Sequence, residues 1–212
     1  RDRSVSRGLG DVYKRQEWYQ EGGIMDTDGH IREKEERTFS AADRIVAEVK
    51  NRTQAAGKII LFGHSAGGQF VHRWALLGGK KNVDVIAVAN SGWFTMPDRD
   101  IDYPYGIKNV GVTDKELAEA FAKPVILFMG GNDVERKPPF RDTPEADAQG
   151  MNRMERCTNY FRQCKAKAEE LRVPFRWKLE TVEGAAHQGV KMAEGAAAYI
   201  FRKSSEDRNR RV

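Results

Sequence analysis

The sequence has few cysteines and prolines and no long apolar run. Its 212 residues include two cysteines and seven prolines, and no stretch approaches the roughly 20 consecutive apolar residues of a membrane-spanning helix. No charged segment followed by an apolar run opens the chain, as a secretory signal would. Internal repeats and low-complexity linkers are also missing. A chain of this length is expected to form one domain and to bury about 70% of the surface that its unfolded form exposes.

The two cysteines fit neither a disulfide nor a metal site. Cys157 and Cys164 stand seven residues apart on one face of a predicted helix. A rise of about 1.5 Å per residue separates their Cα atoms by roughly 10 Å, beyond the roughly 7 Å limit for a disulfide. We therefore predict that both are core residues. Neither a metal nor an organic cofactor is expected. The helix face that Cys157 and Cys164 share also carries Met154, Phe161, Ala168 and Leu171.

Net positive charge is confined to the two ends of the chain. The formal net charge is +5, but residues 1–16 and residues 202–212 each contribute +3, which leaves −1 for the rest. Charge arranged in this way is typical of solvated tails around a near-neutral domain. We therefore expect no nucleic-acid partner and no membrane partner.

Residues 1–16, RDRSVSRGLGDVYKRQ, have no helical or strand period and resemble a translated adapter read-through at the end of an assembled sequence. A disordered native arm is the alternative. On the first interpretation the native sequence begins near Glu17 and is already truncated, so that any targeting signal would be lost and the compartment stays open. We expect residues 17–203 to form a partial α/β domain and residues 204–212 to form a charged tail.

Short apolar runs alternate with helical periods along the rest of the chain. Strands are predicted at residues 59–62, 83–90, 124–129 and 175–182, with helices between them, and this order favours a mostly parallel sheet flanked by helices. The last strand alternates apolar and charged residues, as a strand near the edge of a sheet does. Two capping boxes are expected to open helices, Ser40 with Asp43 and Thr113 with Glu116.

The segment KIILFGHSAGGQF places Ser65 between the first predicted strand and the helix that follows it, which ends at Gly78 and Gly79. A serine in such a sharp turn projects its hydroxyl above the sheet, and Gly63 and Gly67 leave room for the close approach of the backbone. The first N–H groups of the helix, that of Ala66 among them, would face a bound oxyanion. The pattern predicts a nucleophile elbow.

The partners of Ser65 should follow the later strands, because ligands of parallel sheets gather at the carboxyl ends of the strands. Asp133 follows the third strand in FMGGND, and His187 follows the fourth in VEGAAHQG. The order serine, aspartate, histidine is the one that α/β sheets with this elbow use. Asp98 is the alternative acid. His64 and His72 are expected to be structural, the first because neighbouring side chains on the elbow diverge. These expectations name Ser65, Asp133 and His187 as the catalytic residues.

Several segments between residues 58 and 193 resemble the α/β-hydrolase superfamily, and more narrowly an esterase-like group related to polyhydroxybutyrate depolymerases and feruloyl esterases. The shared segments are GHSAGGQFVHR, ANSGWFTMPD with PYG, GGND, TPEADAQGMNRMERC and EGAAHQGVKMA. The resemblance implies an eight-stranded sheet with the elbow after its fifth strand, of which four strands are visible here. The loop that supplies the second oxyanion donor is missing on this interpretation, and the role of QGMNR stays open.

The resemblance implies a serine hydrolase that cleaves a small or polymeric carboxylic ester through an acyl-enzyme. An acyltransferase or peptidase with the same triad, and a catalytically silent binding protein, are the alternatives. The aromatic residues after the second strand could form an acyl pocket or could be ordinary core: Trp93 and Tyr103 as substrate-binding residues, with Phe94 and Tyr105. The truncation interpretation further predicts an exposed apolar edge at Ile59–Phe62, poor solubility and little turnover for this chain alone.

Overall fold

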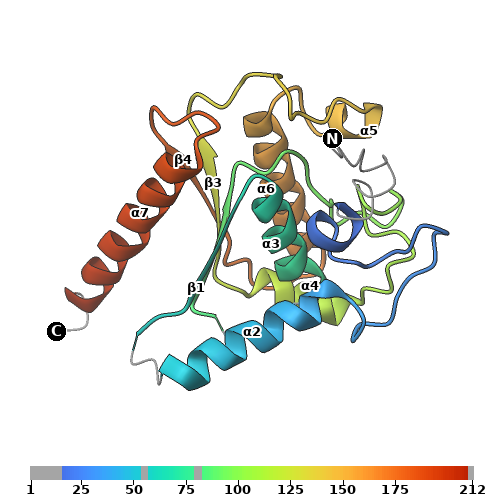
Figure 1. Cartoon of the computed structure of the whole chain (residues 1–212), viewed down its shortest axis with the longest axis horizontal. Coiled ribbons are helices and arrows are strands. Elements are labelled where there is room, and N and C mark those ends of the chain that lie inside the picture. The colour runs from blue at the N-terminus through green and yellow to red at the C-terminus, as the bar shows by residue number, and fades with distance from the viewer. Residues whose placement is uncertain (1–15, 54–56, 79–82, 210–212) are drawn as a thin grey trace, which may run out of the picture.

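A computed structural model of the chain describes residues 16–53, 57–78 and 83–209, with side chains described between residues 17 and 203 (Figure 1). The predicted leader therefore lies outside the described residues except for Gln16. The elements in chain order are η1 (Gln16–Gln20), α2 (Thr38–Thr53), β1 (Ile60–His64), α3 (Ala66–Leu77), β2 (Val85–Ala89), α4 (Asp114–Phe121), β3 (Val125–Gly130), α5 (Pro144–Asp147), α6 (Arg153–Glu170), β4 (Lys178–Val182) and α7 (Gly189–Asn209).

The four strands form one parallel sheet in the order β1-β2-β3-β4, as the alternation of apolar runs and helices predicts. β4 lies at an edge of this sheet, which confirms the interpretation of its alternating pattern. The register pairs His64 with Ala89, Ala89 with Phe128, and Gly130 with Val182. The carboxyl ends of all four strands therefore lie beside one another, and the loops that leave them share one edge of the sheet.

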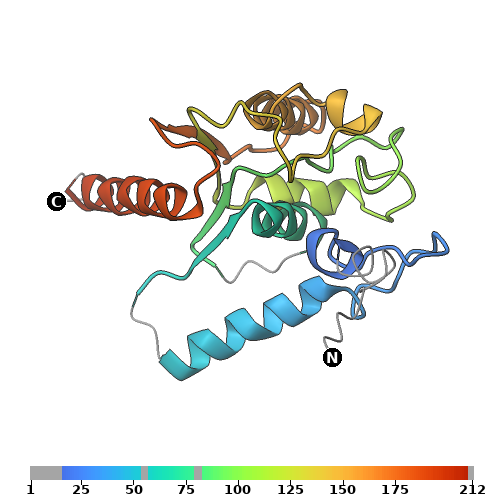
Figure 2. The same cartoon turned by 45° about the horizontal axis from the view of Figure 1, so that its top comes forward.

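Helices cover both faces of the sheet (Figures 1 and 2). α3, α4 and α6 lie on one face, and α7 lies on the other. β3 contributes side chains to the core on both faces of the sheet, because alternate side chains of a strand point to opposite faces. Val125, Leu127 and Met129 belong to the core cluster with α3 and α6, whereas Ile126 and Phe128 pack with residues of α7. All six residues of β3 are buried, so this strand reads as a continuous apolar run.

One of the two predicted capping boxes is wrong. α2 begins at Thr38, so Ser40 lies inside the helix, where its Oγ donates to the carbonyl of Lys34. Asp43 is buried and accepts a hydrogen bond of 3.0 Å from the indole of Trp74, so tertiary contacts determine its position. The other capping box is confirmed, because Thr113 and Glu116 bond reciprocally at the start of α4.

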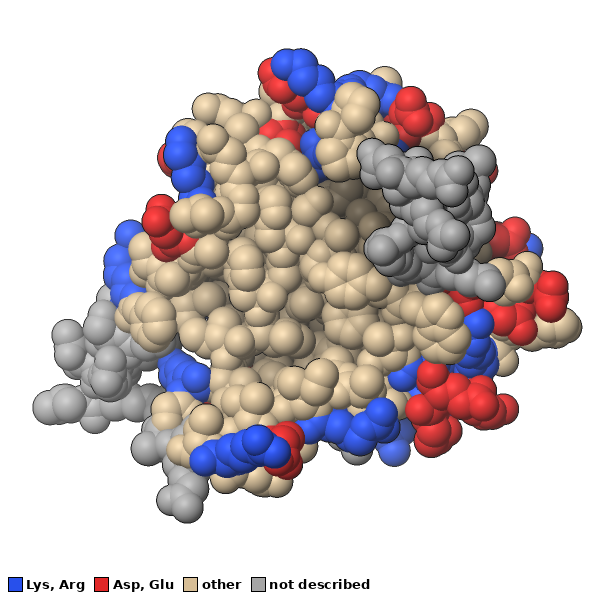
Figure 3. All heavy atoms as spheres, in the orientation of Figure 1, with Lys and Arg blue, Asp and Glu red and all other residues tan. Residues whose placement is uncertain are grey.

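Three further predictions concern the two cysteines, the charged C-terminal tail and the edge strand at residues 59–62. Cys157 and Cys164 are free and buried on α6, as predicted. α7 continues through Asn209, so most of the expected charged tail belongs to this helix. Among the described residues β1 pairs only with β2, and Ile60, Leu61 and Phe62 are half-buried. Figure 3 shows charged side chains around the rim of the face that β1 occupies and an uncharged centre.

Candidate active site

Ser65 lies in the sharp turn between β1 and α3, with φ of 55° and ψ of −115°. Residues other than glycine rarely adopt this backbone conformation. The Ser65 N–H donates to the carbonyl of Ala89 at 2.9 Å, which fixes the turn against the end of β2. A Cβ at Gly63 would lie 2.3 Å from the carbonyl oxygen of Gly67, so only glycine fits there. Ala66 is the first residue of α3, and its N–H has no acceptor within the helix.

The structure brings together the three residues that the sequence analysis selects. A hydrogen bond of 2.9 Å joins Ser65 Oγ to His187 Nε2, and a hydrogen bond of 2.7 Å joins His187 Nδ1 to Asp133 Oδ2. The Asp133 side chain is 2% exposed, and that of His187 is 25% exposed. A carboxylate on one ring nitrogen leaves the other nitrogen free to accept the proton of the serine.

The alternative residues occupy other positions. Asp98 accepts the N–H of Asp100 within its own loop, while Asp133 occupies the Nδ1 side of His187. His72 is buried, with Nδ1 on the carbonyl of Gly68 at 3.1 Å and Nε2 accepting the N–H of Thr95 at 3.1 Å. His72 therefore joins α3 to the loop after β2. Burial holds its pKa well below the ordinary value for histidine.

The His64 side chain packs directly against His187, a contact that the sequence does not indicate. Its ring centroid lies 4.7 Å from that of His187, and its Nε2 is buried without a partner among the described residues. Burial, followed by the neighbouring His187, lowers the pKa of His64, so the ring is neutral near pH 7. His64 packs against the imidazole that bonds Ser65, while its position on the strand keeps it from taking that role.

Asn90 holds the loop of His187, a contact that sequence reasoning misses. Its amide donates to the carbonyl of Ala186 at 3.0 Å and accepts the N–H of Gly130 at 2.7 Å. Asn90 itself has φ of 45°, at the end of β2. Asn90 therefore ties the ends of β2 and β3 to the loop that follows β4. The available signal in the sequence is an asparagine directly after a buried strand, which is too common to identify the role.

Arg153 gives part of the QGMNR segment a role. Its guanidinium donates to Asp133 Oδ1 at 3.2 Å and to the carbonyls of Glu135 at 3.3 Å and Pro139 at 2.8 Å, and it is 5% exposed. In the same segment the Gln149 amide pairs with both backbone groups of Phe94, at 2.8 and 2.7 Å. The segment thus fastens the loop after β3 to the loop after β2 and holds the second oxygen of Asp133.

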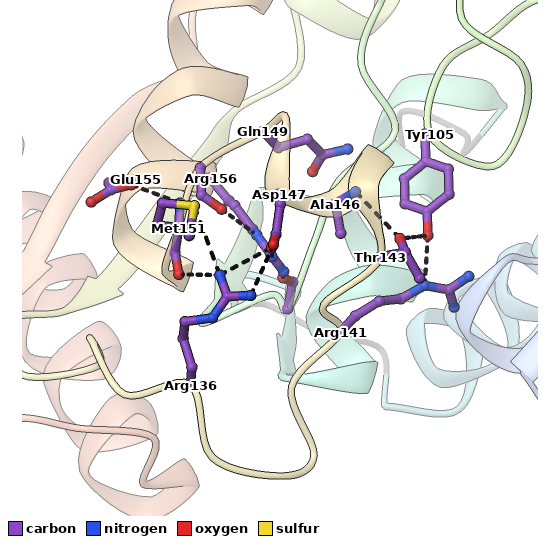
Figure 4. Close-up of polar contacts among 12 residues, drawn as sticks. Tyr105, Arg136, Arg141, Thr143, Ala146, Asp147, Gln149, Met151, Glu155 and Arg156 are labelled. Atoms are coloured by element: carbon purple, nitrogen blue, oxygen red, sulfur yellow. Dashed lines mark hydrogen bonds and ion pairs between the residues drawn. The ribbon is translucent and has the colours of Figure 1, made fainter.

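Two other arginines of this region bind the same carboxylate, that of Asp147 (Figure 4). Arg136 contacts both oxygens of Asp147, at 3.0 and 2.9 Å, and Arg156 contacts Asp147 Oδ1 at 2.7 Å. The hydrogen bond from Arg136 lowers the pKa of Asp147, and Arg156 adds to the effect. Arg156 also donates to the carbonyl of Gly92 at 2.7 Å. These contacts fix α5 beside the loop that carries Trp93.

A cavity of about 420 Å³ opens beside Ser65. Trp93, predicted as a substrate-binding residue, lines it. Tyr103, the other predicted substrate-binding residue, lines an adjacent cavity of about 210 Å³ instead, and its hydroxyl bonds the carbonyl of Glu21. Phe94 is fully buried. The larger cavity is lined by Gln20, Ser65, Ala66, Gln69, Gly92, Trp93, Pro139, Phe140, Arg141, Thr143 and Arg153.

Among the described residues, one group of potential metal ligands comes together, on a surface turn. It comprises Asp26, Asp28 and His30. Asp26 Oδ1 accepts hydrogen bonds from the N–H groups of Asp28 at 3.0 Å and His30 at 2.8 Å, so the carboxylate stabilises the backbone of the turn. In the part of the chain that the structure describes, every helix is too short or too polar to cross a membrane.

Comparisons with known proteins agree with this fold. The solved structure of poly(aspartic acid) hydrolase-1 from Sphingomonas sp. KT-1 matches with a TM-score of 0.80 and 33% identity over 85% of this chain and 69% of that one. A poly(3-hydroxybutyrate) depolymerase from Bordetella parapertussis matches with a TM-score of 0.84 and 30% identity over 91% of this chain and 66% of that one. No protein-family model and no curated protein matches the chain.

The fold and the site define an α/β protein with a serine at a strand-to-helix turn and an aspartate–histidine pair beside it. With the two similar structures, this places the protein among hydrolases built on a parallel sheet. The chain belongs to the α/β-hydrolase superfamily. It spans about two thirds of the length of these two relatives.

Proposed function

We propose that this protein is a serine hydrolase that cleaves a carboxylic ester through an acyl-enzyme. The observation that carries the proposal is the hydrogen-bonded chain from Ser65 Oγ through His187 to Asp133, with lengths of 2.9 and 2.7 Å. A free serine hydroxyl is a poor nucleophile at neutral pH, and a histidine base within hydrogen-bond distance activates it.

In the proposed first step, Ser65 Oγ attacks the ester carbonyl carbon while His187 Nε2 takes the serine proton. Asp133 holds the imidazole tautomer and stabilises the imidazolium. The oxyanion accepts the N–H of Ala66, and His187 returns the proton to the departing alcohol. Water then attacks the acyl-enzyme through the same base and restores Ser65. The acid is buried and the base is partly exposed, an arrangement that suits both steps.

The substrate class follows from the relatives and the cavity. One relative is named for poly(3-hydroxybutyrate) and the other for poly(aspartic acid), so polymers and their short fragments are the first compounds to test. A cavity of about 420 Å³ beside Ser65 accepts a short acyl unit. An acyltransferase or a peptidase would use the same three residues, and an added alcohol or amine that competes with water for the acyl group would reveal it.

The test is covalent labelling by a fluorophosphonate, which requires an activated serine but no turnover. The wild-type chain should be labelled at Ser65, and the Ser65→Ala chain should not be. Ser91 is the matched control, because it follows the neighbouring strand and is 1% exposed. Ser91→Ala should leave labelling unchanged. Undiminished labelling of Ser65→Ala, or an unlabelled wild-type chain that is folded, would overturn the proposal and favour a silent binding protein.

A further inference from the structure

Arg141 lies in the wall of the cavity that opens beside Ser65, on the loop between β3 and α5. Its Nε donates to the hydroxyl of Tyr105 at 2.6 Å, and that hydroxyl also bonds Thr143 Oγ1 at 2.7 Å. The guanidinium carbon lies 4.7 Å from the ring centroid of Trp93 and 5.3 Å from that of Tyr105. Figure 4 shows the terminal nitrogens of Arg141 pointing away from Tyr105 and Thr143. The guanidinium of Arg141 is thus held at its Nε edge by the Tyr105 hydroxyl.

The charge of Arg141 has no counter-ion among the described residues, unlike that of the other arginines on this segment. Arg136 and Arg156 are bound to Asp147, and Arg153 is bound to Asp133. The two terminal nitrogens of Arg141 have no hydrogen-bond acceptor within the same described part of the chain. Arg141 is half-buried, so its terminal nitrogens remain available to a ligand that supplies acceptors, and hydrogen bonds between charged groups are the stronger ones.

Further polar groups around the cavity favour an anionic, hydrogen-bonding ligand. Arg73 is fully buried with its guanidinium carbon 4.1 Å from the Trp93 ring centroid, so a second positive charge contacts this ring. Gln69 also lines the cavity, is 7% exposed and has an Oε1 atom without a partner. The acids of the adjacent cavity include Glu17, which is bound to Arg32, and Glu21, which lies beyond ion-pair distance of Arg141.

We propose that the substrate carries a carboxylate group that binds the terminal nitrogens of Arg141 while the scissile ester lies at Ser65. This inference rests on the proposed function and narrows it from esters in general to esters of acidic compounds. A guanidinium fixed at Nε presents two parallel donors, the geometry that matches a carboxylate with two hydrogen bonds. The aromatic rings beneath the guanidinium hold it flat without using these donors.

The test compares two esters with one skeleton, monomethyl glutarate with a free carboxylate and neutral dimethyl glutarate. Binding is measured by calorimetry on the Ser65→Ala chain, in which no turnover is expected. We expect the monoester to bind roughly 10- to 100-fold more tightly than the diester, the range for hydrogen bonds to a charged group. Adding Arg141→Gln should abolish this preference, and adding Arg141→Lys should keep part of it.

Arg136→Gln is the matched control, since it removes a guanidinium of the same loop that does not line the cavity. It should keep the preference for the monoester. Equal binding of the two esters, no measurable binding of either, or a preference that survives Arg141→Gln in a folded chain would overturn the inference. Fluorophosphonate labelling of the wild-type chain tests the proposed function separately, so the failure of one is distinguishable from the failure of the other.

Discussion

Gly130, the last residue of β3, determines how closely the His187 loop approaches the sheet. A Cβ at Gly130 would lie 2.6 Å from the carbonyl oxygen of Ala185 and 2.9 Å from that of Ala186. Ordinary contact begins at 3.4 Å, so an alanine would push the strand and the loop apart by about 0.8 Å, the difference between 3.4 and 2.6 Å. Both atoms are backbone, so no flexible side chain can absorb the shift. His187 follows directly and moves with the loop.

This displacement should weaken the Ser65–His187–Asp133 chain without removing any of its members. A misplacement of about 1 Å costs roughly 100-fold in rate, and overpacking a buried site costs about 1–3 kcal/mol of stability. We expect Gly130→Ala to slow fluorophosphonate labelling by about 10- to 100-fold and to lower the melting temperature. The measurement is the second-order labelling rate, with circular dichroism to establish that the chain is folded.

Gly131→Ala is the control, one residue further along. Its Cβ would meet nothing closer than the Glu183 carboxylate at 3.4 Å, at the end of an exposed side chain. This variant should be labelled at nearly the wild-type rate. The reasoning fails if Gly130→Ala and Gly131→Ala react equally fast, because the contact of β3 with the loop would then not position His187.

Two further predictions concern the acid of the site and the cap of α4. Asp133→Asn should slow labelling by up to about 10⁴-fold, as loss of the orienting carboxylate does in serine proteases, whereas Asp98→Asn should have little effect; a larger loss for Asp98→Asn would reverse the assignment. Burial raises the pKa of Glu116, but hydrogen bonds from Lys34 and the Thr113 cap outweigh it and lower the pKa to about 2. The stabilisation by Glu116 is therefore present above its unfolded value of 4.5 and is lost as pH falls toward 2. Since the side chain is 36% exposed, Glu116→Gln should cost only about 1 kcal/mol at pH 7 and nothing near pH 2, measured by urea unfolding.

The parts of the fold that could be predicted from sequence depend on local patterns. A buried strand needs a continuous apolar run, and a residue that follows such a strand in a parallel sheet must lie at the common edge. Ser65, Asp133 and His187 each follow a strand and were therefore identifiable. The predicted capping box of Ser40 and Asp43 is wrong because a tertiary contact overrides a local pattern. Asp43 fits the capping pattern in the sequence, but it is buried against Trp74 on α3. A contact across 31 positions overrides the local preference.

The residues that support the site were not identifiable in this way, because their partners lie far away in the chain. Asn90 bonds the carbonyl of Ala186, 96 positions later, and Arg153 bonds Asp133 across 20 positions. Neither residue carries a local signature. The QGMNR segment is recognisable as a motif, but the sequence alone leaves its role open. Its contacts with Phe94 and Asp133 require the loops after β2 and β3 to be in place.

Arg153 also explains how a buried acid can serve His187 without rotating. Asp133 uses its two oxygens for different partners, Oδ2 for His187 at 2.7 Å and Oδ1 for Arg153 at 3.2 Å. A rotation of the carboxylate would break both contacts at once, and a 2% exposed side chain has no water to replace them. Arg153 is fixed in turn by the carbonyls of Glu135 and Pro139. Arg153, the first residue of α6, therefore helps to set the orientation of the imidazole that bonds Ser65, through the carboxylate of Asp133.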